Sequence, residues 1–426
     1  MKRRNLMIIA LLLVAGGANA QKEYRQLKAQ FKNDEEKNVE NPLRTVQGLQ
    51  KNDKFKEDPE LFHYGVEAYL KINDLQNRKA YLKQQCDTAK LFDSVLGMYD
   101  YAVGCDTLEA LEAHKRGKSK VKYKYRGQHG ELLRHQYTNL YNGGQYYLLK
   151  KNFENAYKFF SMYCDIRSNP VWGGGKVSAK DSAKLQRAAY WATVCAFQLG
   201  NKDRFFKYNA LALRDTTYRQ KELEFAARMY KAAGDTAGFV KTLEKGMDEF
   251  PRLDYFFTNL TDYYNSKKQY DKAMELADRV LKVDPRSLMA QYGRSLVLLK
   301  MKKYDECVTL SKSIIQSDST YTGAYYNAGA AYLAKATELE AEITSNMTLA
   351  QIRNKKREED KLMRNALVYL EQYRALAPQA IEWWGRPLYN IYLALNMGEK
   401  FDEIDKLITK AENDKKAAEQ AAAEKK

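Results

Sequence analysis

Apolar residues recur at intervals of three and four over most of the chain, and the clearest case lies between Asp254 and Arg286. Phe257, Leu260 and Tyr264 share one face of a helix. A polar turn follows at 267–269, and a second apolar helix face runs from 270 to 281. Pro285 ends this helix, because the residue before a proline is driven out of the α region. The pattern predicts a hairpin of two short helices, which needs neighbouring hairpins to bury both faces.

The hairpin pattern repeats every 34 residues, since Pro251 precedes Pro285 by 34 positions and Ser319 follows it by 34. The first-helix positions Phe257, Leu260, Thr261 and Tyr264 match Tyr325, Ala328, Gly329 and Tyr332 in a later unit. A repeat of this length, with small residues where two helices approach and aromatics between hairpins, resembles the tetratricopeptide repeat. The resemblance implies an all-α fold, a right-handed superhelical solenoid of helical hairpins of this type.

Further hairpins are expected on both sides of this one, with a looser register. They are predicted at 140–163, 181–213, 222–251, 288–319 and 383–407. Two degenerate hairpins are expected to start within 59–71 and 90–104, and 169–175 is expected to be a flexible loop. Residues 21–57 are expected to form one or two helices, broken at Asn41-Pro42.

The unit that begins at Thr322 contains an insertion at about 336–360, so its second helix arrives 25 residues late. The inserted residues are charged and favour helix. We expect the insertion to lengthen both helices of its hairpin; a protrusion that grips a partner is the alternative. The predicted domains are therefore a signal peptide (1–20), a degenerate hairpin region with a basic connector (21–126), the solenoid (127–409) and a charged tail (410–426). The tail is either a polar capping helix or a frayed end.

The first twenty residues have the features of a secretory signal. A basic segment at Lys2-Arg3-Arg4 precedes an apolar core that is too short to span a membrane, and Ala18-Asn19-Ala20 is a small-x-small cleavage site. The mature chain is expected to begin at Gln21, in the periplasm or secreted to the cell envelope; a retained anchor is the alternative. No cysteine follows the cleavage point, so no lipid anchor is expected, and no later stretch is apolar enough for membrane insertion.

The chain is basic, with a formal net charge of +17 that falls to +14 when the three basic residues of the signal are removed. This charge favours anionic partners, and an exported protein is expected to meet envelope surfaces and acidic proteins and no nucleic acid. The segment Lys115–Arg126 holds seven basic residues and no acidic one. It is either a solvated connector or a patch that binds an anionic envelope surface.

The five cysteines leave two interpretations open. Cys86 and Cys105 are the closest pair and could form a disulfide in an oxidising compartment. The alternative is that the cysteines serve as small hydrophobic residues, since Cys307 takes the place that Ala273 has one repeat earlier.

The whole mature chain resembles the signal-bearing tetratricopeptide-repeat proteins of Gram-negative, Bacteroides-like cell envelopes. The resemblance is carried by the repeats that end at Pro251, Pro285 and Pro378, and by the segments 139–144 and 325–332. It implies a protein that binds others through a groove. It also suggests O-glycosylation at Asp-Ser/Thr motifs, of which the chain has seven, starting at Asp87, Asp93, Asp106, Asp181, Asp215, Asp235 and Asp318. The alternative is that these residues cap helices and form turns.

The sequence contains no recognised catalytic constellation. Its four histidines have no metal-ligand spacing, and no phosphate-binding loop or nucleophile motif occurs in a suitable setting. We therefore expect no enzyme activity, no catalytic residue, no metal and no cofactor.

Binding is expected on the first helices, which line the concave face in this repeat type. The candidate groove residues are Tyr141, Asn142, Tyr190, Asn259, Tyr292, Tyr326 and Asn327. Tyrosine gives contact area at low entropic cost; packing between repeats is the alternative role. The predicted function is an exported protein-protein interaction scaffold that binds a peptide or protein partner. The alternative is a glycan-uptake-associated binding protein, whose helical-repeat members are lipoproteins.

Overall fold

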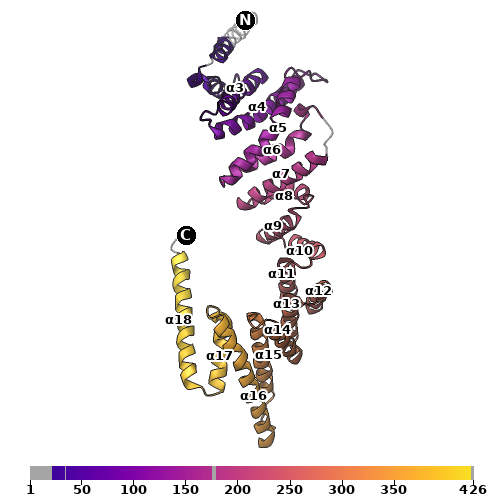
Figure 1. Cartoon of the computed structure of the whole chain (residues 1–426), viewed down its shortest axis with the longest axis vertical. Helices are drawn as coiled ribbons and strands as arrows, with labels where there is room; N and C mark the ends of the chain where they lie inside the picture. Colours follow the sequence, from indigo (N-terminus) through magenta and orange to yellow (C-terminus); the bar gives the residue numbers. More distant parts are fainter. Residues whose placement is uncertain (1–21, 34, 175–178, 424–426) are drawn as a thin grey trace, which may run out of the picture. The chain divides into compact units, whose positions relative to one another are not determined.

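The computed structural model describes residues 22–33, 35–174 and 179–423, and the predicted signal peptide lies outside them. The regular secondary structure of these residues is helical throughout, which confirms the all-α prediction. The helices form two compact units, Met1–Gly234 and Asp235–Lys426, each a stack of helical hairpins (Figure 1). None of the described helices is both long and apolar enough to cross a bilayer. The handedness of the superhelix and the predicted domain limits stay predictions.

The first unit begins with a helical segment at 22–31. It continues with η1 (Glu36–Asn38), α2 (Asn41–Leu49), α3 (Pro59–Tyr81), α4 (Thr88–Lys115), α5 (Arg126–Leu149), α6 (Phe153–Asp165), η2 (Ile166–Ser168), η3 (Pro170–Trp172), α7 (Ala179–Gln198), α8 (Lys202–Ala212) and α9 (Arg219–Ala232). The second unit contains α10 (Thr236–Glu249), α11 (Asp254–Ser266), α12 (Tyr270–Val283), α13 (Leu288–Lys300), α14 (Tyr304–Ser317), α15 (Thr322–Ala341), α16 (Leu349–Leu376), α17 (Ile381–Ala394) and α18 (Gly398–Ala423).

The hairpin predicted at 254–286 is confirmed as α11 and α12, and its turn shows how the repeat is closed. Lys268 in that turn has a positive φ of 56°. Gly200, Gly234 and Lys302 also have positive φ, and these four positions are spaced 34 residues apart. At each of these positions the backbone adopts the left-handed conformation that ends a helix. Two of the four positions hold lysine, a residue type from which this conformation is not predicted.

The prediction of two degenerate hairpins within 59–104 is wrong, because α3 and α4 are the two long helices of one hairpin. Neither helix is interrupted by a turn, and glycines allow the two to approach closely. A Cβ atom at Gly65 would lie 1.9 Å from the ring of Tyr101, and one at Gly97 would lie 2.4 Å from the ring of Tyr69. These glycines therefore serve close helix packing and do not mark separate repeats.

The core of the first unit is rich in aromatic residues. Phe159, Phe160 and Tyr163 of α6 are fully or almost fully buried between α5 and α7. The segment 169–172, expected to be a flexible loop, instead packs into this core, since η3 buries Val171 and Trp172. The free energy gained by burying these two apolar side chains outweighs the turn propensity of Asn-Pro and holds the segment against the core.

The insertion in the second unit lengthens both helices of its hairpin, as expected. α15 has 20 residues and α16 has 28, against 13 and 14 in the preceding hairpin of α13 and α14. The added turns pack together through Ala336 and Leu362, and salt bridges join Lys355 to Glu342 and Lys356 to Glu340. The residues from 410 onwards continue α18 as one helix as far as Ala423.

All five cysteines have free thiols, which agrees with their interpretation as small hydrophobic residues. Cys105 and Cys307 are fully buried, and burial raises the pKa of the Cys307 thiol to about 11.

Candidate functional site

Three first helices in the second unit bring aromatic side chains together. Tyr292 lies on α13, Tyr326 on α15 and Trp383 on α17, and α15 contacts both of the other helices. The ring of Tyr326 lies 5.4 Å from Trp383 and 5.5 Å from Tyr373 of α16, centroid to centroid. Tyr321, directly before α15, lies 5.5 Å from Tyr292. We call Tyr292, Tyr321, Tyr326, Tyr373 and Trp383 the aromatic row.

The aromatic row is open to solvent at one end. Trp383 is 52% exposed, Tyr292, Tyr321 and Tyr326 are half-buried, and Tyr373 is buried. Trp383 and Tyr326 meet edge to face, with 85° between their ring planes. The neighbouring ring therefore holds the indole in place while much of its surface stays accessible.

The electrostatic surroundings of the aromatic row are acidic. Burial raises the pKa of all four tyrosines, and that of Tyr321 reaches about 12. The charged groups that add to this rise are carboxylates, with Asp254 and Asp318 near Tyr321 and Glu382 near Tyr373. A positive charge beside a tyrosine would lower its pKa, and among the described residues none acts on these four.

Several other aromatic rings of the same unit are covered by a cation from the chain itself. Lys272 lies over Tyr264 at 5.4 Å, Arg374 over Trp384 at 5.0 Å and Lys400 over Tyr392 at 5.6 Å, each measured to the ring centroid. Within the described part of the chain, no lysine or arginine lies over a ring of the aromatic row. The aromatic row thus lacks an intramolecular cation–π partner.

The predicted tyrosines of the first unit already contact other side chains of the chain. Lys184 lies over the ring of Tyr141 at 4.9 Å. Tyr190 is 5% exposed and stacks on Tyr218, with 4.3 Å between ring centroids. Arg187 lies over Tyr218 at 4.4 Å and forms a salt bridge with Asp215. The placement of Tyr190 corresponds to the alternative interpretation, packing between repeats.

The predicted asparagines differ in exposure. Asn142 is exposed, and Asn259 uses its amide to donate to the Tyr255 carbonyl at 2.7 Å. Asn327 is fully buried and donates to Ser295 Oγ at 2.8 Å, while its Oδ1 has no hydrogen-bond partner. Only the first two are therefore placed to meet a partner.

The basic connector is partly neutralised by the first unit itself. Lys115 forms a salt bridge with Glu57, Arg126 forms one with Asp106, and the backbone N–H of Lys124 donates to Glu109. Lys118, Lys120 and Lys122 are exposed. Salt bridges therefore hold both ends of the segment. Its two interpretations, a solvated connector and a patch that binds an anionic surface, both stay predictions.

Two histidines that are 66 residues apart meet in the first unit, which their sequence spacing did not reveal. His63 Nδ1 and His129 Nε2 are 3.1 Å apart, and the ring of Tyr125 stacks on His63 at 4.1 Å. Burial, and then the neighbouring His63, lower the pKa of His129 to about 4. The available signal was that both histidines lie on the apolar faces of their helices. The pair is a buried polar contact that joins α3 to α5.

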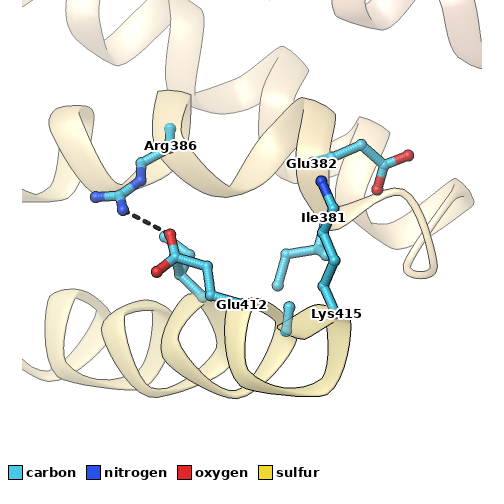
Figure 2. Close-up of a pocket in the computed structure, with 7 residues that line it drawn as sticks. Ile381, Glu382, Arg386, Glu412 and Lys415 are labelled. Atoms are coloured by element: carbon cyan, nitrogen blue, oxygen red, sulfur yellow. Dashed lines mark hydrogen bonds and ion pairs between the residues drawn. The ribbon is translucent and has the colours of Figure 1, made fainter. Parts of the chain in front are cut away.

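The last hairpin of the second unit forms a cleft. The cleft has a volume of about 390 Å³ and lies between α17 and α18 (Figure 2). Ile381, Ile408 and Ala411 give it an apolar base, and Arg386 forms a salt bridge of 2.8 Å with Glu412 at one side. Glu382 and Lys415 line the opposite side.

The described residues contain no group of three or more histidine, cysteine, aspartate or glutamate side chains that could hold a metal ion. Tyr292 and Tyr326 are brought together in the second unit, and Trp383, Tyr321 and Tyr373 join them. These three were not predicted from the sequence, although Trp383 lies on a first helix as the predicted tyrosines do.

No protein-family model and no curated protein matches the chain. Solved structures are similar to it at low identity. The C-terminal part of a TPR repeat-containing protein from Cytophaga hutchinsonii is 12% identical over 62% of this chain and 93% of that chain, with a TM-score of 0.40. A tetratricopeptide repeat protein from Parabacteroides merdae is 16% identical over 60% and 99%, with a TM-score of 0.36. Yeast Tom70 is 12% identical over 92% and 86%, with a TM-score of 0.36. At these values the similarities do not assign a function.

Proposed function

We propose that this protein is a non-enzymatic scaffold that binds an extended segment of a partner protein across α13, α15 and α17. The proposal rests on the aromatic row, in which successive first helices carry neighbouring rings. About half of the Trp383 surface stays exposed to solvent. Aromatic side chains dominate binding energy at protein interfaces, because they bury a large area with few rotatable bonds.

The repeat architecture supports the same proposal. Each hairpin contributes an equivalent first-helix position, so a partner that lies across the stack meets one side chain per repeat. An extended peptide can follow such a series, whereas a compact small molecule would need an enclosed site.

The proposal includes export of the protein, with cleavage after Ala20. It rests on the basic, apolar and small-residue segments at 1–20. Sequencing the N-terminus of the native protein tests it. A chain that starts at Gln21 supports export, and a chain that retains Met1 contradicts it.

Affinity capture from the envelope of the source cells tests the binding function. The mature protein is compared with the double variant Tyr326→Ala/Trp383→Ala and with Leu393→Ala, which removes a 60%-exposed side chain elsewhere on α17. We expect one specific protein to be retained by the mature chain and by Leu393→Ala, and to be lost with the double variant. Unchanged circular dichroism of all three proteins excludes unfolding as the cause.

Two other results would contradict the proposal. A partner that binds the double variant as well as the unaltered chain contradicts the proposed surface. Binding of envelope glycans without any protein partner would favour the alternative, a glycan-uptake-associated binding protein.

A further inference from the structure

The aromatic row has no cation of the described residues over its rings. Several other rings, in both units, do carry a lysine or arginine side chain of the chain itself, as the half-buried Tyr141 carries Lys184 and the buried Trp384 carries Arg374. The face of an aromatic ring carries a negative partial charge, which attracts a cation within about 6 Å of the centroid. Among the described residues, no lysine or arginine takes this position in the aromatic row.

We propose that the aromatic row receives a lysine or arginine side chain of the partner segment, with Trp383 and Tyr326 as the rings that contact it. This inference rests on the proposed function and names the chemistry of its partner. The exposed half of the Trp383 indole offers the contact surface, and the edge-to-face contact with Tyr326 fixes its orientation.

The carboxylates beside the aromatic row fit the same cation. Asp254 and Asp318 lie near Tyr321, and Glu382 lies near Tyr373 and directly precedes Trp383. An ammonium or guanidinium group that contacts Trp383 therefore meets a ring face with Glu382 close by, and Asp254 and Asp318 add negative charge at the Tyr321 end of the aromatic row. An acidic segment would meet the same carboxylates with like charge, at a cost in affinity.

The net charge of the two units agrees with this assignment. Lysine and arginine outnumber aspartate and glutamate by 41 to 25 in residues 1–234, but only by 30 to 29 in residues 235–426. The second unit is thus almost neutral and does not repel a basic segment, although the chain as a whole is strongly basic.

The test uses a displayed library of random twelve-residue peptides, selected on the mature full-length chain. We expect the selected peptides to be enriched in lysine and arginine, and to bind Trp383→Ala about tenfold more weakly. The best peptide is then synthesised with its lysine acetylated or its arginine replaced by citrulline, which removes the charge and keeps most of the shape. This change should weaken binding to the unaltered chain by a similar factor and have little further effect on Trp383→Ala, because both changes remove the same contact.

Leu393→Ala is the matched control and should bind every peptide as the unaltered chain does. Peptides that need Trp383 but show no enrichment in basic residues, or that tolerate loss of their charge, overturn the cation assignment and leave the proposed function intact. If no selected peptide depends on Trp383 or Tyr326, the proposed binding surface is wrong, and the inference is wrong with it.

Discussion

The two units use aromatic residues in the same places and for different purposes. In the first unit, Tyr190 is buried against Tyr218, and Lys184 covers Tyr141. In the second unit, Tyr326 is half-buried and contacts a half-exposed Trp383, with no cation from the described residues over either ring. The difference teaches that an aromatic at a first-helix position is not by itself a binding residue. Its role depends on whether the chain supplies a stacking ring or a cation to cover it.

The largest effect is expected for Tyr190→Ala. Removing a ring that is 5% exposed leaves a cavity between α7 and the Tyr218 turn, and should lower the free energy of unfolding by about 3–5 kcal/mol. The matched change Trp383→Ala should cost less than about 1 kcal/mol, because half of that side chain already contacts water. Urea unfolding followed by circular dichroism measures both. Equal losses for the two variants would remove the distinction between the two units.

Glu222 makes the stability of the first unit depend on pH. Its buried carboxyl lies 2.7 Å from Thr193 Oγ1, which also lies 2.7 Å from the Tyr190 carbonyl oxygen. Thr193 Oγ1 donates to this carboxyl, as does Asn209 Nδ2 at 2.7 Å, and both hydrogen bonds favour the ionised form but are outweighed by burial. Burial raises the pKa of Glu222 to about 7.

The sign of this dependence follows from the raised pKa. The contribution of Glu222 to stability is complete below about pH 4.5 and is lost as pH rises towards 7. Glu222→Gln, which stays neutral, should remove this loss, a difference of up to about 3 kcal/mol at pH 8. Urea unfolding at pH 5 and pH 8 measures it. A glutamine variant with the same pH dependence as the unaltered chain would show that Glu222 is not the titrating group.

His129 should give a dependence of the opposite sign. Burial lowers its pKa from 6.5 to about 4, so its contribution is complete above pH 6.5 and is lost as pH falls towards 4. We expect His129→Phe to reduce this acid-side loss by roughly 2 kcal/mol, measured by urea unfolding between pH 4 and pH 7. If the acid-side loss is retained in full, His129 is not the titrating group.

The smallest effect is expected for Lys184→Ala, which uncovers Tyr141. A half-exposed cation–π contact of this kind contributes about 0.5–1 kcal/mol, so the free energy of unfolding should fall by no more than that. Thermal or urea unfolding detects the change. A loss above about 2 kcal/mol would mean that the lysine side chain is part of the packing rather than a cover for the ring.

Much of the fold followed from periodicity. The hairpin at 254–286 and the lengthened helices around the 336–360 insertion appear as expected, because apolar spacing fixes which helix face is buried. The sequence pattern predicted two hairpins where α3 and α4 form one, because Gly65 and Gly97 stand at positions where a repeat has a small residue. In the structure these glycines instead lie beneath tyrosine rings. Periodicity gives the buried face but does not show which helix covers it.

The candidate site was predictable in part. Tyr292 and Tyr326 were expected on the first helices and lie together there, whereas Tyr321 and Tyr373 belong to a turn and a second helix and were not anticipated. The histidine pair was also hidden, because His63 and His129 are brought together only when α3 packs beside α5.

The sequence by itself determined the helices, their hairpin pairing over most of the chain and the positions that face the next repeat, because these depend on residues a few places apart. The tertiary structure decided which tyrosines are packing residues and which remain open. That choice depends on side chains far apart in sequence, such as Tyr218 against Tyr190 and Trp383 against Tyr326. Local periodicity carries no information about such pairs, since they form only when successive hairpins stack.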